Sequence, residues 1–186
     1  MRSFTGTDAV FVDAEVSESL DRATLERHFD HLVAANGPAL SRIAASYTNT
    51  PSDRADLLQE IAMALWQALP RFRGECSERT FLFRIAHNRA IAYLARSRSQ
   101  PSSGEEVEVH DPAPNPEAAL AREDQVERLR RAIHQLPVVY RQVITLSLEG
   151  LGYGDISEVL GISESNVGVR LTRARQMLRE SLEKQQ

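Results

Sequence analysis

This 186-residue chain has only one cysteine, Cys76, and no apolar run that approaches the ~20 residues needed to span a bilayer. A single cysteine excludes an internal disulfide and any multi-cysteine metal site. The N-terminus lacks a basic segment followed by an apolar core, so we expect no signal peptide, no membrane insertion and residence in the cytoplasm. No carboxylate pair, nucleophile–base set or metal-ligand cluster occurs at interpretable spacing. We therefore expect a protein that is not an enzyme and has no metal and no cofactor.

The net charge of −4 is unevenly distributed along the chain. Residues 61–98 carry seven Arg and two Glu, a balance of +5, whereas residues 1–60 and 99–121 each carry a balance of −5. Almost all of the cations are arginine, whose planar group suits bidentate contacts with phosphates and base edges. Because local fields steer nucleic acid, the negative average does not exclude a nucleic-acid partner.

Residues 148–179 have the layout of a helix-turn-helix. A short helix is expected at 153–160, followed by Gly161, which tolerates the positive φ of a tight turn. Ser163 is suited to cap the next helix with its hydroxyl. That helix has one apolar stripe at helical spacing, formed by Val167, Leu171, Ala174 and Leu178.

The opposite face of that helix carries groups that a helix in the DNA major groove presents to bases and phosphates. An arginine-rich solvated face is the alternative interpretation. The candidate DNA contacts on this face are Ser165, Asn166, Val169, Arg170 and Arg173.

The remaining apolar periodicity also predicts helices, and no strand pair is apparent. Residues 1–20 are expected to be mobile, and a helix from Asp21 is expected to end at Asn36-Gly37-Pro38, where a second helix begins. Further helices are expected at 53–69, 80–96, 117–136 and 138–148. We interpret His87 as a surface or capping residue. The fold class is therefore all-α.

Residues 98–116 are rich in Ser, Pro and acids and nearly free of apolar side chains, which is typical of a flexible linker. The expected organisation is a mobile segment at 1–20, a helical domain at 21–97, the acidic linker at 98–116, and the helix-turn-helix domain at 117–186.

Two motif sets resemble the bacterial sigma-70 family, in its small extracytoplasmic-function (ECF) group. Region 2 of that family is similar to residues 53–96, with Asp-Leu-Leu-Gln-Glu-Ile followed by Phe-Leu-Phe-Arg-Ile-Ala-His-Asn-Arg-Ala. Region 4 is similar to residues 129–179, with Leu-Pro-Val-Val-Tyr-Arg-Gln-Val-Ile and the helix-turn-helix. The resemblance implies a sigma factor that binds RNA polymerase core and directs promoter-specific initiation.

For region 2, the resemblance implies that the helix at 53–69 docks on the clamp helices of the largest polymerase subunit. The implied core-binding residues are Asp53, Asp56, Gln59 and Glu60. The basic loop and helix that follow would hold the −10 element and its melted strand, with arginines along the phosphates. The implied contacts are Arg71, Arg73, Phe83, Arg84, Asn88 and Arg89.

Asn88 would sit in a pocket for a flipped base, with Phe81, Phe83 and Tyr93 around it, although Phe81 and Tyr93 could equally be core residues. The linker acids would either follow the RNA exit path or keep a disordered linker in solution. Cys76 is either a redox sensor or incidental.

For region 4, the resemblance implies that the recognition helix reads the −35 element, with Arg173 the position best matched by motif, and that the domain contacts the polymerase flap. An anti-sigma factor or other regulator is a further implied partner. Two departures bear on function. The family's Asp-x-Glu-Asp motif is Asp53-Arg54-Ala55-Asp56 in this chain, and Gly168 stands where a basic residue is common. The glycine costs helix stability or permits close approach of DNA.

Two other functions fit parts of the sequence. A stand-alone helix-turn-helix regulator leaves the Phe72-Arg73-Gly74 loop and residues 81–89 unexplained. A helical decoy that titrates an anti-sigma factor would bind that partner without directing transcription.

Overall fold

The computed structural model describes residues 8–97 and 116–184, with side chains placed for residues 22–97 and 125–184. These ranges hold only helices, which confirms the all-α class. In chain order they are α1 (Asp8–Ala45), α2 (Pro51–Ala68), the 3₁₀ turn η1 (Leu69–Arg71), α3 (Glu78–Ser97), α4 (Pro116–Gln135), α5 (Val138–Leu148), α6 (Tyr153–Leu160) and α7 (Glu164–Glu183). The expected mobility of residues 1–7 and the expected flexible linker at 98–115 lie outside the described residues.

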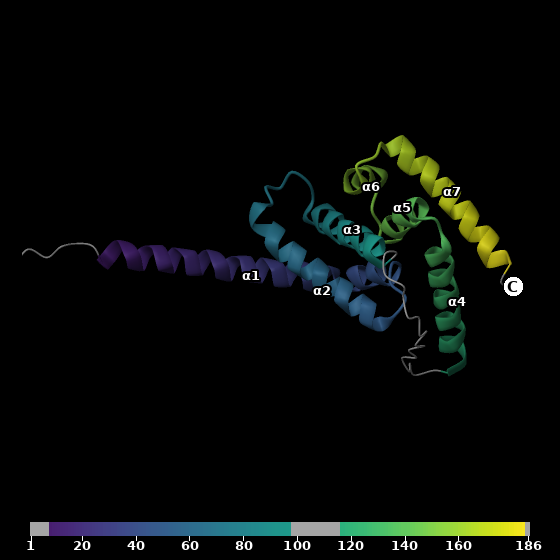
Figure 1. The fold of residues 1–186 in the computed structure, drawn as a ribbon, viewed down its shortest axis with the longest axis horizontal. Helices are drawn as coiled ribbons and strands as arrows, with labels where there is room; N and C mark the ends of the chain where they lie inside the picture. Colours follow the sequence, from purple (N-terminus) through teal and green to yellow (C-terminus); the bar gives the residue numbers. More distant parts are fainter. Residues whose placement is uncertain (1–7, 98–115, 185–186) are drawn as a thin grey trace, which may run out of the picture.

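α1 is one long helix, which corrects two expectations. It starts at Asp8, in the segment expected to be mobile, and it continues through Pro38, where we expected a break. Pro38 has no N–H, so the carbonyl of Ala34, four residues earlier, receives no helical hydrogen bond. Ala34 and Pro38 are both exposed. Beyond the proline, Leu40 and Ile43 are buried in the core, so tertiary packing holds the helix together. Figure 1 shows the purple end of α1 extending away from the other helices.

α2 and α3 form the rest of the N-terminal half. Thr50 caps α2 by accepting a hydrogen bond from the Asp53 amide at 3.1 Å, and Pro51 occupies the first turn, where its missing N–H costs nothing. α2 buries Leu57, Ile61 and Leu65 against α1 and α3. α3 follows the basic loop.

The C-terminal half contains the predicted helix-turn-helix. Gly161 ends α6 with φ of 64°, the left-handed conformation that glycine adopts without strain. The Ser163 hydroxyl then accepts from the Asn166 amide at 3.3 Å, as predicted for the cap of α7. The predicted stripe of α7 is buried: Val167, Leu171, Ala174 and Leu178. α7 packs on α4, α5 and α6.

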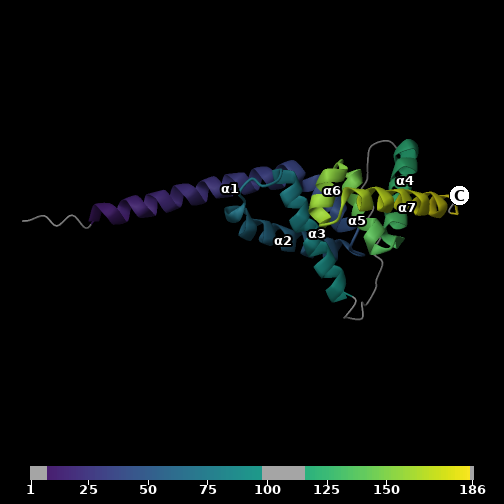
Figure 2. The same ribbon diagram turned by 90° about the horizontal axis from the view of Figure 1, so that it is seen from above.

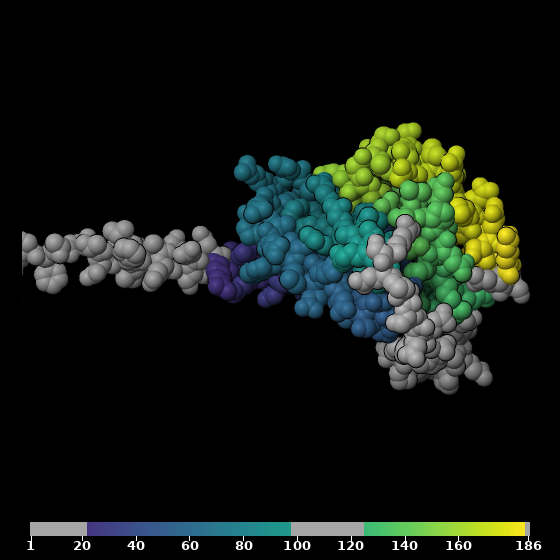
Figure 3. Space-filling view, in the orientation of Figure 1, coloured from purple at the N-terminus to yellow at the C-terminus, as the bar shows by residue number. Residues whose placement is uncertain are grey.

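The two halves lie against each other rather than apart. α3 packs on α6, and one continuous cluster of buried residues runs from α1–α3 into α4–α7. Figure 2 shows α6 beside α3 from a second direction. In Figure 3 the teal surface of α2 and α3 meets the green and yellow surface of α5–α7. This contact brings the helix-turn-helix next to the expected −10 face.

Candidate nucleic-acid interface

The outer face of α7 carries the residues predicted to read DNA. Ser165, Asn166 and Arg173 are exposed, and Val169 is an apolar side chain left 50% exposed. Since the opposite stripe is buried, the packing of α7 orients these groups outward. Arg170 is half-buried, and its Nε donates to Asn166 Oδ1 at 2.9 Å. The helix therefore presents a mixed set of donors and methyl groups on one face.

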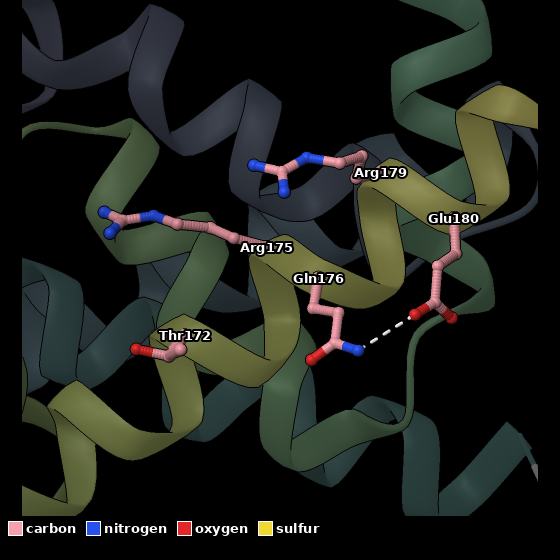
Figure 4. Close-up of a pocket in the computed structure, with 5 residues that line it drawn as sticks. All are labelled: Thr172, Arg175, Gln176, Arg179 and Glu180. Carbon is pink, nitrogen blue, oxygen red and sulfur yellow. Dashed lines mark hydrogen bonds between the residues drawn. The ribbon is translucent and has the colours of Figure 1, made fainter.

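Two further arginines, which we did not predict as DNA contacts, lie farther along α7 in a shallow hollow. The hollow is lined by Thr172, Arg175, Gln176, Arg179 and Glu180. Figure 4 shows the Arg175 and Arg179 side chains extending from α7 one turn apart. Gln176 Nε2 donates to Glu180 Oε1 at 3.0 Å, the dashed line in the figure. These arginines extend the cationic character of α7 beyond its first two turns.

The expected −10 face centres on the loop between η1 and α3. Arg71, Arg73, Asn88 and Arg89 are exposed, and Arg84 is half-buried. A hollow of about 200 Å³ opens there, lined by Arg71, Phe72, Arg73, Glu75, Cys76, Phe81 and Arg84. The rings of Phe72 and Phe81 lie 4.5 Å apart, centroid to centroid. Arginine and aromatic groups thus meet in one hollow, the combination that holds unstacked bases and their phosphates.

Phe83 does not fit its predicted role in this arrangement. Its side chain is fully buried in the core, and the Arg79 guanidinium lies over its ring at 5.2 Å from the centroid. The ring cannot reach a base without a change in the surrounding helices. Phe72, which we did not select, lies in the hollow instead. Asn88 is exposed and does not line that hollow.

The expected core-binding face of α2 is accessible. Asp56 and Gln59 are exposed. Asp53 and Glu60 are half-buried, and both have partners on α3: Glu60 pairs with Arg96 at 2.6 Å. The pKa of Tyr93 is raised, first by burial and then by the negative charge of Asp53, to which the phenol is hydrogen-bonded. The two α3 contacts fix the orientation of the acidic face.

His87 of α3 is buried beside Tyr47, which follows the end of α1. His87 is 4% exposed, which corrects the expectation of a surface residue, and its ring faces the edge of Tyr47 at 6.1 Å between centroids. Burial lowers the pKa of His87 to about 4 because a charged imidazolium would lose its water. His87 is therefore neutral at physiological pH.

A network of polar contacts joins the two halves of the chain. Glu149, at the end of α5, accepts from Arg42 through both carboxylate oxygens at 2.8 and 2.7 Å. Arg79 donates to the backbone carbonyl of Glu149. On α6, Asp155 accepts from the Thr80 hydroxyl at 3.0 Å.

The same contact continues at the −10 face. Glu158 of α6 pairs with Arg84 at 2.8 Å. Glu158 also reaches Cys76, whose pKa is raised first by burial and then by the carboxylate charge. Acidic groups of the helix-turn-helix half therefore border the arginine-lined hollow.

Two negative findings apply to the described part of the chain. None of its helices is long and apolar enough to cross a membrane. Within residues 8–97 and 116–184, no three His, Cys, Asp or Glu side chains gather as potential metal ligands.

Comparison with known proteins gives matches for both halves. The family described as "Sigma-70 region 2" matches residues 32–100, and "Sigma-70, region 4" matches residues 126–178. The RNA polymerase sigma-H factor of Pseudomonas aeruginosa is 30% identical over 182 residues, covering 92% of this chain and 94% of that protein. The ECF RNA polymerase sigma-E factor of Escherichia coli K12 is 30% identical over 164 residues, covering 82% and 85%.

Solved structures show the same fold. CnrH, solved in complex with the cytosolic domain of CnrY, is 28% identical with a TM-score of 0.65, covering 87% of this chain and 91% of that one. The sigma factor RpoE from Bartonella quintana, solved with the anti-sigma factor NepR, is 24% identical with a TM-score of 0.66, covering 84% and 98%. At that identity the second likeness concerns the fold alone.

Proposed function

Because this chain belongs to the ECF sigma factors of the sigma-70 family, we propose that it binds RNA polymerase core in the cytoplasm and directs initiation at promoters with −35 and −10 elements. Members of this family are transcription initiation factors and not enzymes. The region 2 match covers the segment that a stand-alone regulator leaves unexplained, so that alternative is not favoured.

The observation that best supports DNA recognition is the outward face of α7. This face falls within the region 4 match and presents Asn166, Arg170 and Arg173 toward solvent over a buried stripe. A helix in the major groove uses such groups for base edges. We assign residues 117–186 to a region 4 domain that reads the −35 element.

Residues 21–97 form the proposed region 2 domain. The hollow between Phe72, Phe81 and Arg84 supports binding of the melted −10 strand, with Arg71, Arg73 and Arg89 along the phosphates. The exposed acid and amide groups of α2 support docking on the clamp helices of polymerase. A regulator such as an anti-sigma factor is a further proposed partner, as the family resemblance implies, and the 28% identical CnrH was solved in complex with the cytosolic domain of CnrY. Region 4 would also contact the polymerase flap.

Transcription with purified core polymerase and a genomic fragment library tests the proposal. Addition of the chain should create discrete new start sites with shared upstream sequences. Arg173→Ala should abolish them, because it removes a base-contacting cation, whereas Lys184→Ala, which removes the same charge at the end of α7, should not. Binding of an anti-sigma factor with no start sites would instead favour the decoy function. Absence of both core binding and initiation would contradict the sigma assignment.

A further inference from the structure

An apolar side chain lies at the centre of the outward face of α7. We call this face the reading face, and it consists of Ser165, Asn166, Val169, Arg170 and Arg173. Val169 is 50% exposed, although the apolar stripe of the same helix is buried. Its nearest neighbours along the helix are the side chains three and four positions away. All four of them are exposed and polar or charged: Ser165, Asn166, Thr172 and Arg173. The isopropyl group of Val169 is therefore surrounded by hydrogen-bonding groups on a surface that faces water.

Neither packing nor helix propensity accounts for a valine at this position. The core contacts of α7 are made by the opposite stripe, which includes Val167 and Leu171. Valine loses side-chain freedom in a helix and has a lower helix propensity than alanine. Val169 is thus slightly unfavourable for the free protein, and it becomes favourable when an apolar partner covers it and removes its surface from water.

The major groove of DNA offers such a side chain one kind of apolar partner. The base edges there present hydrogen-bond donors and acceptors, and the C5-methyl group of thymine is their one apolar group. Asn166 and Arg173 have polar groups for the donors and acceptors, whereas Val169 has none. Cytosine in the place of thymine would set its N4 amino group against an apolar side chain that cannot accept a hydrogen bond. The chemistry of Val169 therefore favours thymine over cytosine.

We propose that Val169 contacts the C5-methyl group of a thymine in the −35 element and makes this chain prefer a T·A pair at that position. This inference rests on the proposed function, because it requires α7 to lie in the major groove. Arg170 and Arg173 supply charge and hydrogen bonds to base edges or phosphates. Val169 adds a contact that depends on one methyl group, and burial of that group should contribute about fourfold to affinity.

Replacement of thymine by deoxyuridine tests this contact, because it removes the methyl group and leaves base pairing unchanged. Holoenzyme made from the full-length chain and core polymerase is bound to a promoter taken from the mapped start sites, with each −35 thymine on either strand replaced singly. Competition with the unmodified promoter at one salt concentration gives the relative affinity. We expect one replacement to weaken binding by about fourfold for wild type, and Val169→Ser to bring that ratio to about one. Val139→Ser, which changes a 43% exposed valine of α5, should leave the ratio unchanged.

The proposal would be overturned by a −35 element without thymine, or by deoxyuridine replacements that leave wild-type binding unchanged. A ratio that persists in Val169→Ser would also overturn it, since another side chain would then contact the methyl group. If Val169→Ser weakened binding to thymine and deoxyuridine promoters equally, the valine would contact the DNA backbone or polymerase instead of a base. Failure of the proposed function gives a different result: the chain would bind no core polymerase and would yield no start sites, so the sigma assignment would fail and this inference with it.

Discussion

Arg170 and Asn166, one turn apart on α7, form a pair that limits what each can read. Because Arg170 Nε donates to Asn166 Oδ1, the two terminal amino groups of Arg170 remain for guanine O6 and N7. The same bond fixes the orientation of the Asn166 amide, so the two side chains approach DNA as one unit. We predict that Asn166→Ala and Arg170→Ala weaken discrimination at the same base pair, with Arg170→Ala costing about 1–3 kcal/mol.

Anisotropy titrations with −35 duplexes, each with one base pair replaced, would measure this effect. The double variant should cost less than the sum of the single variants, since the two side chains act as one unit. Arg175→Ala is the control, and it should weaken binding to all duplexes alike. Loss of discrimination at two different base pairs would show that Asn166 reads DNA independently.

His87 makes stability depend on pH. Its pKa is lowered by burial from 6.5 to about 4, so the unfolded chain binds a proton at a pH where the folded chain does not. The neutral ring's contribution is complete above pH 6.5 and is lost as pH falls toward 4. We predict that, between pH 7 and pH 5, wild type loses about 2 kcal/mol more unfolding free energy than His87→Gln.

Urea denaturation at the two pH values would measure that difference. His31→Gln, which changes an exposed histidine of α1, is the matched control. His134 also has a pKa lowered by burial and then by the charges of Arg141 and Arg130, so some pH dependence should persist without His87. An unchanged pH profile in His87→Gln would contradict the prediction.

At the scale of helices, Gly168 lies where α7 contacts α6 within the helix-turn-helix. A Cβ at this position would lie 3.4 Å from Tyr153 Cε2, an ordinary van der Waals contact between α7 and α6. The glycine therefore lies toward α6, whereas Val169 and Arg170 face outward. We predict that Gly168→Ala raises the unfolding free energy by up to about 1 kcal/mol through helix propensity and leaves −35 affinity unchanged.

Thermal denaturation and −35 duplex binding of the same variant would decide between the two interpretations of this glycine. A higher midpoint with unchanged affinity is the expected result. A loss of affinity would instead show that the DNA backbone approaches the helix at Gly168. Ser165→Ala, on the reading face, provides the comparison for a variant that affects binding.

The sequence predicted elements where local signals and packing agree. The cap at Ser163, the turn at Gly161 and the buried stripe of α7 all followed from residue type and spacing. α1 was divided wrongly because Pro38 is a local helix-breaking signal, whereas burial of Leu40 and Ile43 is a tertiary effect that no local pattern contains. His87 and Phe83 were misassigned for the same reason, since both are buried partly by helices distant in sequence.

For the whole molecule, the contact between the two halves lies apart from the acid and amide groups of α2. The exposed Asp56 and Gln59 lie on α2, whereas the contact with α6 is made by Thr80 and Arg84 of α3. We predict that Asp56→Asn/Gln59→Ala weakens binding to core polymerase by the same factor in wild type and in Asp155→Asn/Glu158→Gln. The free energies should add within about 0.5 kcal/mol, because the two sites share no partner.

Titration of labelled full-length protein with core polymerase in the absence of DNA would measure the four affinities. Loss of the α3–α6 contact shifts the core affinity of the α2 variant and of its parent by the same factor if α2 binds core in the same way with and without that contact. A smaller effect of the α2 variant in the Asp155→Asn/Glu158→Gln background would mean that loss of the α3–α6 contact alters the α2 contact itself. Additive effects would instead show that core polymerase binds α2 in the same way whether or not the α3–α6 contact is formed.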